Sequence, residues 1–148
     1  MKTLYLLLFL LVVFTDYASK YYIKTTMIEG MSIPVINGLF HITYVLNTGA
    51  AFGLFAGQRA LFIAVGSLLF IVTAVYYRYI VRQGIFFQVG VALFLGGALG
   101  NLIDRIRFGQ VVDFLDFRIW PVFNIADIAI CLGAGFILLF VLRSELQE

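Results

Sequence analysis

The chain has 148 residues, of which 63% are hydrophobic and 12% are charged, and its formal net charge is +2. A soluble domain is nearer half apolar and a quarter charged, and so short a chain cannot bury this much apolar surface inside itself. These values exclude a soluble globular fold, and the small, dispersed charge argues against a nucleic-acid-binding surface. The sequence therefore predicts a single membrane domain over residues 1–148.

Four apolar segments are long enough to be membrane spans. A bilayer core takes about 20 helical residues to cross, and hydrocarbon leaves no partner for unpaired backbone groups. We expect an all-α integral membrane protein whose four transmembrane helices lie at about 4–23, 60–77, 85–103 and 121–142. Four crossings place both termini on one side of the membrane. The distribution of Lys and Arg does not decide which side.

The stretch between the first two spans, about 24–59, has a different character. Asn37-Gly38 is a strong hairpin-turn signal between two short apolar runs. In the second run, apolar side chains alternate with others, which is typical of a half-buried strand; they are Phe40, Ile42, Tyr44 and Leu46. We expect a small β-hairpin or sheet that rests on the membrane surface, followed by a tight loop of small residues from Asn47 to Gly53.

The third and fourth spans contain pairs of small residues four apart. Gly96 and Gly100 form one such pair, and Ala129 and Gly133 form another. Small residues at this spacing let two helices approach closely in lipid. We expect both pairs to serve helix packing.

Two groups of charged residues at the ends of spans have structural interpretations. Asp16 and Lys20 are four apart in the first span, so they lie on one helix face and can pair. Asp104 follows the third span, where it is expected to neutralise Arg105 or Arg107 and to be a support residue. Ionisable groups at such positions are expensive, so they need partners or a purpose.

Two other polar residues, Asp116 and Cys131, also receive structural interpretations. Asp116 lies two residues before Arg118 in a short connection, and we expect it to be a solvated surface acid. Cys131 lies in an apolar stretch and is expected to be a buried structural thiol. With this one Cys and one histidine, His41, the chain offers no disulfide framework and no zinc site of the usual ligand types.

Asp113 and Asp127 are harder to explain as structural residues. Asp127 is expected about two turns into the fourth span, counted from a helix start at Pro121, with Asn124 on the same face. No Lys or Arg stands within helical reach of it. Asp113 follows the third span in an apolar setting, also without an adjacent cation. Because the connection between them is short, we expect the two carboxyl groups to meet at one membrane face.

Two facing carboxyl groups can share one proton, because like charges a few ångströms apart do not both ionise easily. Such a pair could hydrolyse a bond by general acid/base catalysis. A proton-coupled transporter with Asp127 as proton carrier would use the same residues, and a non-catalytic scaffold would use the glycine-rich helix faces. A triad around His41 or a Ser-Lys dyad built from Ser19 or Ser32 is less favoured.

Five short motifs, spread from the first span to the fourth, resemble those of the lipoprotein signal peptidases, the signal peptidase II family. They occur in the family's order, and together they form a highly specific pattern. The motifs are Asp16–Lys20, Asn47–Phe52, Gly100–Arg105, Val111–Phe114 and Phe123–Asp127.

The resemblance implies an aspartyl endopeptidase with Asp113 and Asp127 as its catalytic dyad and no metal or cofactor. It implies supporting roles around the substrate and the dyad for eight further residues, which are Asp16, Lys20, Asn47, Gly49, Asn101, Arg105, Asn124 and Ala126. Two features depart from the family pattern: Tyr17 replaces a usual polar residue, and the chain between the two aspartates is short.

The resemblance also implies where the protein acts and on what. The substrates would be diacylglyceryl-modified prolipoproteins, cut just before the lipidated Cys. The chain would be a monomer among the lipids of the bacterial cytoplasmic (inner) membrane, with both termini inside and the active site near the outer face. No nucleic-acid partner is expected. The small-residue loop after Asn47 and the hairpin would then form a platform over the cut peptide.

Overall fold

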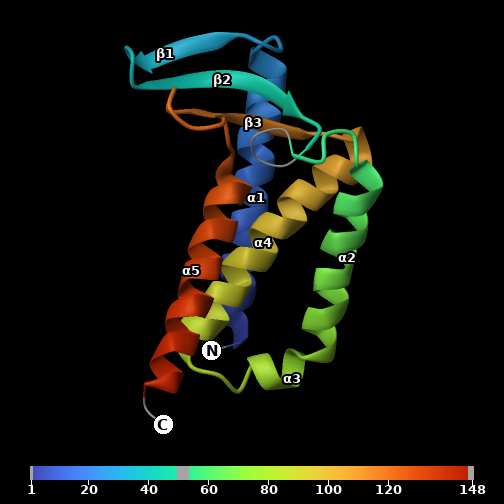
Figure 1. Ribbon diagram of the computed structural model, residues 1–148, viewed down its shortest axis with the longest axis vertical. Coiled ribbons are helices and arrows are strands. Elements are labelled where there is room, and N and C mark those ends of the chain that lie inside the picture. The colour runs from blue at the N-terminus through green and yellow to red at the C-terminus, as the bar shows by residue number, and fades with distance from the viewer. Residues whose placement is uncertain (1, 50–53, 147–148) are drawn as a thin grey trace.

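The computed structural model describes residues 2–49 and 54–146. Four long helices run along the molecule, a one-turn helix follows the second of them, and a small sheet lies across one end, opposite the end that holds the two termini (Figure 1). The helices are α1 (Lys2–Thr26), α2 (Arg59–Val75), the single turn α3 (Tyr77–Ile80), α4 (Ile85–Phe108) and α5 (Ile125–Glu145), and the strands are β1 (Ser32–Ile36), β2 (Phe40–Asn47) and β3 (Val111–Asp116).

Three helices are long and apolar enough to cross a membrane, over Leu4–Thr26, Ile85–Phe108 and Ile125–Ser144. The predicted span at 60–77 forms the shorter α2 of 17 residues, and the one-turn α3 follows it. α4 is the central helix, since it packs against α1, α2 and α5. The helices leave many large apolar side chains exposed. A surface of this kind is stable in contact with lipid and unfavourable in contact with water.

The fourth predicted span begins later than expected. Residues from Pro121 to Asn124 are not helical, and Phe123 forms an isolated bridge with Leu115. Helix α5 begins at Ile125 because Asn124 is its N-cap, with an extended backbone and a side chain that accepts a hydrogen bond from the Asp127 N–H. Asp127 therefore lies in the first helical turn. The prediction that placed it about two turns inside the helix was wrong.

The predicted hairpin is confirmed, but the sheet contains a strand that the sequence analysis missed. β1 and β2 are antiparallel around a turn in which Gly38 has a φ of +72°, a backbone conformation that favours glycine. β3 lies between α4 and α5 in sequence and pairs antiparallel with β2, giving the order β1-β2-β3. The sheet is therefore built from two distant parts of the chain, so the domain is not purely helical outside the segment 24–59.

A small apolar core joins the sheet to the end of α1. Its buried members come from α1, from the segment after it, from β2 and from β3, and they are Ile23, Met27, Tyr44, Val112 and Phe114. Ile42 and Leu46 pack against this cluster, as the alternating pattern of β2 predicts. Because Val112 and Phe114 enter this core, the side chain of Asp113 between them points away from it.

Close packing at the predicted small residues is confirmed. A Cβ added at Gly96 would lie 2.9 Å from the Val12 Cβ of α1, and one added at Gly133 would lie 2.6 Å from the Gly90 carbonyl oxygen. Real Cβ atoms do not approach that closely. These helices therefore meet at distances that larger side chains would prevent.

Candidate active site

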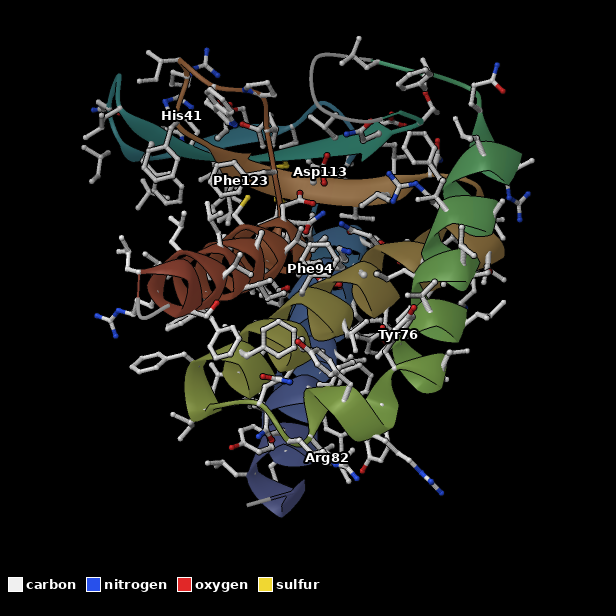
Figure 2. All side chains as sticks on the ribbon, turned by 60° about the horizontal axis from the view of Figure 1, so that its bottom comes forward. His41, Tyr76, Arg82, Phe94, Asp113 and Phe123 are labelled. Carbon is white, nitrogen blue, oxygen red and sulfur yellow. The ribbon has the colours of Figure 1, made fainter. Side chains whose placement is uncertain are left out.

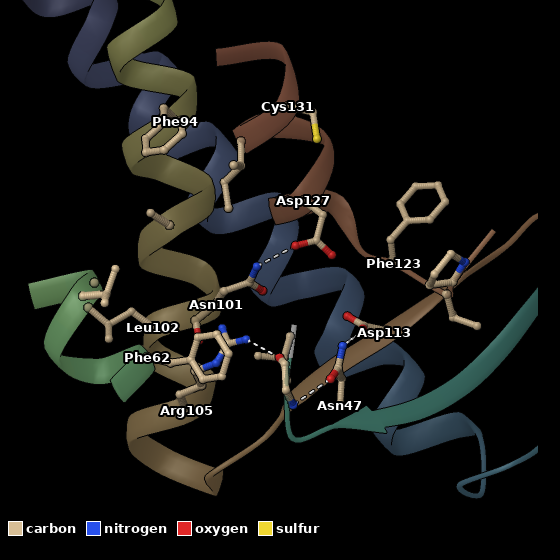
Figure 3. Close-up of a pocket in the computed structure, with 18 of the residues that line it drawn as sticks. Asn47, Phe62, Phe94, Asn101, Leu102, Arg105, Asp113, Phe123, Asp127 and Cys131 are labelled. Atoms are coloured by element: carbon tan, nitrogen blue, oxygen red, sulfur yellow. Dashed lines mark hydrogen bonds between the residues drawn. The ribbon is translucent and has the colours of Figure 1, made fainter. Parts of the chain in front are cut away.

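A cavity of about 520 Å³ lies between the helices and the sheet. Six of the residues that the sequence analysis selected line it, contributed by the β2 end and its following loop, α4, β3 and α5 (Figure 3); they are Asn47, Gly49, Asn101, Arg105, Asp113 and Asp127. Apolar side chains form most of the remaining wall. The other four selected residues, Asp16, Lys20, Asn124 and Ala126, are buried beside the cavity.

Asp113 enters the cavity from the middle of β3, where it pairs with Val45 of β2. Its side chain accepts a hydrogen bond of 2.9 Å from Asn47 Nδ2 and one of 2.6 Å from Asn124 Nδ2. Burial, and next the negative charge of Asp127, raise the pKa of Asp113 to about 7, although these two hydrogen bonds act in the opposite direction. Asp113 can therefore carry a proton near neutral pH.

Asp127 enters the same cavity from the first turn of α5. Its Oδ1 accepts a hydrogen bond of 2.8 Å from Asn101 Nδ2, and its Oδ2 accepts one of 3.1 Å from the Asn124 backbone N–H. Together with the bond from the Asp127 N–H to Asn124 Oδ1, this forms a capping box. The backbone of the helix start therefore holds the carboxyl group in one orientation.

Asn124 connects the two acids. Its side chain is fully buried, with Nδ2 at 2.6 Å from Asp113 Oδ1, while its own backbone N–H and Oδ1 bind Asp127. One residue thus positions both carboxyl groups of the cavity.

The predicted pair of Asp16 and Lys20 is confirmed, with 2.7 Å between Asp16 Oδ2 and Lys20 Nζ. Asp16 Oδ1 also accepts a hydrogen bond of 2.9 Å from the Ala126 N–H, so α1 holds the first turn of α5. Lys20 also contacts Asp104 Oδ2 at 3.1 Å and Asn101 Oδ1 at 2.9 Å. These charged groups form a buried cluster behind the cavity.

The expected partner of Asp104 was wrong. Asp104 pairs with Lys20, because this side of α4 faces α1. Arg105 lies one residue further round the helix and reaches the other way, so that its Nη2 donates a 2.9 Å hydrogen bond to the Gly49 carbonyl. Arg107 lies over the ring of Phe108. Sequence spacing alone could not show which neighbouring element each of these charged residues of α4 faces.

Two further expectations about exposure were wrong. Asp116 is buried. Its carboxyl group accepts a hydrogen bond of 2.7 Å from Thr43 Oγ1 and pairs with Arg118 Nη1 at 2.9 Å. Burial alone would raise the pKa of Asp116, but the hydrogen bonds from Thr43 and Arg118 lower it below its usual value. Cys131 is exposed and lines the cavity, because it lies one helical turn after Asp127 on the same face of α5.

Sequence reasoning missed Phe62 of α2, which lines the cavity and whose ring lies 4.4 Å from the Arg105 guanidinium carbon. A cation over an aromatic face is attracted to it and is held in place by it. The only sequence signal is an aromatic residue in an apolar helix. That signal is too common in this chain to select one Phe among 16.

The loop after β2 is fixed at its start by the site itself. The Gly49 N–H donates to Asn47 Oδ1 at 2.9 Å, and the Gly49 carbonyl accepts from Arg105. A Cβ at Gly49 would lie 2.6 Å from the Leu54 carbonyl oxygen and 3.2 Å from the Ala56 Cα. Gly53, the other loop glycine considered, lies outside the described residues.

Replacing Gly49 with Val should therefore displace this loop and, with it, Asn47 and Arg105. We expect the cleavage that the sequence resemblance implies to be about 100-fold slower, since a shift near 1 Å in a catalytic arrangement can have that effect. Gly84→Ala is the matched control, because its Cβ would meet the Phe140 ring at an ordinary 3.5 Å, outside the cavity. Normal cleavage and insertion by Gly49→Val would refute a role of this loop.

Comparison with known proteins identifies the family to which this chain belongs. The model of the family described as Signal peptidase (SPase) II matches residues 8–143, nearly the whole chain. The chain belongs to the signal peptidase II family. The resemblance noted in the sequence motifs is thereby confirmed, and the activity is that of an aspartyl endopeptidase that removes signal peptides from prolipoproteins.

Relatives are similar over most of the chain. The lipoprotein signal peptidase of Moorella thermoacetica is 54% identical over 129 residues, which are 87% of this chain and 86% of that protein. The lipoprotein signal peptidase of Clostridioides difficile is 45% identical over 144 residues, 96% of this chain and 97% of that one. A bacterial membrane enzyme solved by the in meso method at 2.3 Å resolution has a TM-score of 0.91 and 34% identity, covering 99% of this chain and 92% of that one.

Proposed function

We propose that Asp113 and Asp127 are the catalytic dyad of this peptidase. The supporting observation is that both carboxyl groups border one cavity, each held by two N–H donors. Within residues 2–49 and 54–146, the ion pairs are made by Asp16, Asp104 and Asp116, so neither Asp113 nor Asp127 belongs to one. This arrangement favours a pair that shares one proton over a structural ion pair.

In the proposed reaction, Asp113 starts protonated and Asp127 starts ionised. Asp127 takes a proton from water as the water oxygen attacks the scissile carbonyl carbon, and Asp113 gives its proton to the carbonyl oxygen. The tetrahedral intermediate then breaks its C–N bond. Asp127 returns its proton to the leaving nitrogen, and Asp113 recovers its own from the hydroxyl that becomes the new carboxyl group. Both residues end as they began.

The raised pKa of Asp113, at about 7, predicts a pH dependence with a definite sign. Asp113 is protonated below this pH and ionised above it, so the active form is lost as the pH rises. We expect kcat/KM to fall about tenfold per pH unit above about pH 7, because kcat/KM reports ionisations of the free enzyme. Initial rates of precursor cleavage in detergent would measure this. A rate that stays constant up to pH 9 would show that Asp113 need not be protonated.

The eight supporting residues divide into two groups in this proposal. Those around the cavity orient the dyad or shape the substrate channel, and they are Asn47, Gly49, Asn101, Arg105 and Asn124. Asp16, Lys20 and Ala126 fasten α1 to α4 and to the start of α5. Their contacts with the dyad or its neighbours support these roles.

We further propose four membrane crossings, with α2 as the shortest, both termini in the cytoplasm and the sheet with the active site near the outer face. The sheet and the termini lie at opposite ends of the molecule (Figure 1), and Asp113 lies far from Arg82 of the α3–α4 connection (Figure 2). The exposed apolar side chains of Ile119 and Trp120, in the connection between β3 and α5, suit the membrane interface.

The substrate in this proposal is a diacylglyceryl-modified prolipoprotein, cut just before its lipidated Cys by a monomeric enzyme. The apolar cavity wall supports this substrate class, since Phe62, Phe94 and Ile130 surround the polar dyad with surface suited to lipid or an apolar peptide. The purified protein should cleave a lipidated precursor in a gel-shift assay. It should not cleave the same precursor with that Cys replaced by Ala, and equal cleavage of both would contradict recognition of the lipid.

A further inference from the structure

Lys20 is a buried cation that does not reach the cavity. Its side chain is 3% exposed, and its ammonium group has three acceptors within reach: Asp16 Oδ2 at 2.7 Å, Asp104 Oδ2 at 3.1 Å and Asn101 Oδ1 at 2.9 Å. An ammonium group has three N–H donors and no acceptor. The three contacts therefore use its full donor capacity, and one of them is made to a neutral residue of the active site.

The contact with Lys20 determines which way the Asn101 amide faces. Of the two polar atoms in the Asn101 amide, only the oxygen can accept a hydrogen bond from an ammonium group, so Oδ1 must face Lys20. The same oxygen also accepts from Asn124 Nδ2 at 3.2 Å. The Nδ2 group is then directed at Asp127 Oδ1, 2.8 Å away (Figure 3). Rotating the amide by half a turn would set its NH2 group against the ammonium and its oxygen against the carboxylate. Both contacts would be repulsive.

We propose that Lys20 is a positioning residue for the reaction. Its ammonium fixes the amide orientation of Asn101, and Asn101 in turn holds the carboxylate of Asp127 with an N–H donor. This inference rests on the proposed role of Asp127. It explains how a cation can serve the dyad without forming an ion pair with it, which leaves the carboxylate free to take a proton from water.

The first test replaces Lys20 with Met, which is similar in length but cannot donate. We expect kcat for a lipidated precursor to fall about 100-fold while KM stays unchanged, because the orientation of a catalytic group is lost and the substrate-binding wall is not. Lys24→Met is the matched control, one helical turn further along α1, where the ammonium lies over the Phe108 ring outside the cavity. Its kcat and KM should equal those of the unchanged protein.

Lys20→Met alone leaves Asp16 and Asp104 buried without their cation, which can prevent folding. The double variant Lys20→Met/Asp104→Asn removes one negative charge together with the positive one, so the cluster keeps its net charge. Asp16 keeps its hydrogen bond from the Ala126 N–H. We expect this variant to fold, as followed by thermal unfolding in detergent, and to retain the low kcat. Recovery of the original kcat would overturn the proposal, since Lys20 would then only neutralise acids.

A double-mutant cycle separates positioning from general stabilisation. If Lys20 acts through Asn101, Lys20→Met/Asp104→Asn should lower kcat no further in a protein that already carries Asn101→Ala. Losses that multiply would show an independent, structural role and would refute the inference. A wrong dyad assignment would give a different result from a wrong role for Lys20. In that case Asp113→Asn or Asp127→Asn would remain active, whatever the effect of the Lys20 variants.

Discussion

Asp127→Asn should reduce prolipoprotein cleavage about 10²- to 10⁴-fold, the usual contribution of a positioned acid or base. An amide cannot take the proton from water that the ionised carboxylate is proposed to accept. The shape of the residue is kept, and the Asp127 N–H can still cap α5 through Asn124 Oδ1. The variant should therefore insert and bind substrate, which pull-down of the lipidated precursor would measure alongside the gel-shift assay.

Asp113→Asn should have an equally large effect for the complementary reason. Its amide cannot give a proton to the carbonyl oxygen, although it keeps the shape of the residue and its oxygen can still accept one of the two hydrogen bonds from Asn47 and Asn124. The control is Asp116→Asn on the same strand, whose carboxyl group binds Thr43 and Arg118 away from the cavity. We expect that control to cleave normally. Full activity in either dyad variant would remove the assignment.

Gly97→Val should also give a large effect, on both stability and cleavage. A Cβ at Gly97 would overlap the Ala126 carbonyl oxygen and would lie 2.9 Å from the Ile130 Cγ1. Ala126 is completely buried and immediately precedes Asp127, so α5 can make room only by moving the Asp127 carboxylate. Overpacking of this kind destabilises by about 1–3 kcal/mol, and a shift near 1 Å in the site can slow the reaction about 100-fold.

Gly135→Ala in α5 is the matched control for this prediction. No atom lies within 4 Å of the Cβ that it would add, and Ala is favoured over Gly in a helix by about 0.5–1 kcal/mol. Thermal unfolding in detergent should therefore show Gly97→Val less stable than the unchanged chain and Gly135→Ala at least as stable. If Gly97→Val unfolded at the normal temperature and cleaved at the normal rate, the close α4–α5 contact would not position the dyad.

The features that sequence reasoning predicted correctly depend on neighbouring residues. The apolar segments of α1, α4 and α5, the turn at Gly38 and the pair of Asp16 and Lys20 follow from helix length, backbone freedom and the i, i+4 spacing. The candidate dyad also emerged from local signals, since Asp113 and Asp127 are acids in apolar settings without a nearby cation. The family motifs led to the same two residues, and their catalytic role stays a prediction.

The features that it missed depend on contacts across long stretches of chain. β3 is recognisable only beside β2, since six residues with two acids carry no clear strand period until the pairing of Val45 with Asp113 is known. The burial of Asp116 depends on Thr43, 73 residues away in the sequence. Placing the start of α5 at Ile125 required the capping box of Asn124, where Pro121 had indicated an earlier start.

By itself, the sequence determined that this is a membrane protein, that the segments of α1, α4 and α5 are long and apolar, that a hairpin turns at Gly38, and which acids lack an ordinary structural purpose. Length, periodicity and spacing are properties of a local backbone, so they can be read without knowing what packs against it. Only the tertiary structure decided that Lys20 faces Asp104 and Asn101, and that Asn47, Asn101 and Asn124 surround the two aspartates. Apolar spans resemble one another, and which faces meet depends on the close fit of glycines and buried polar groups.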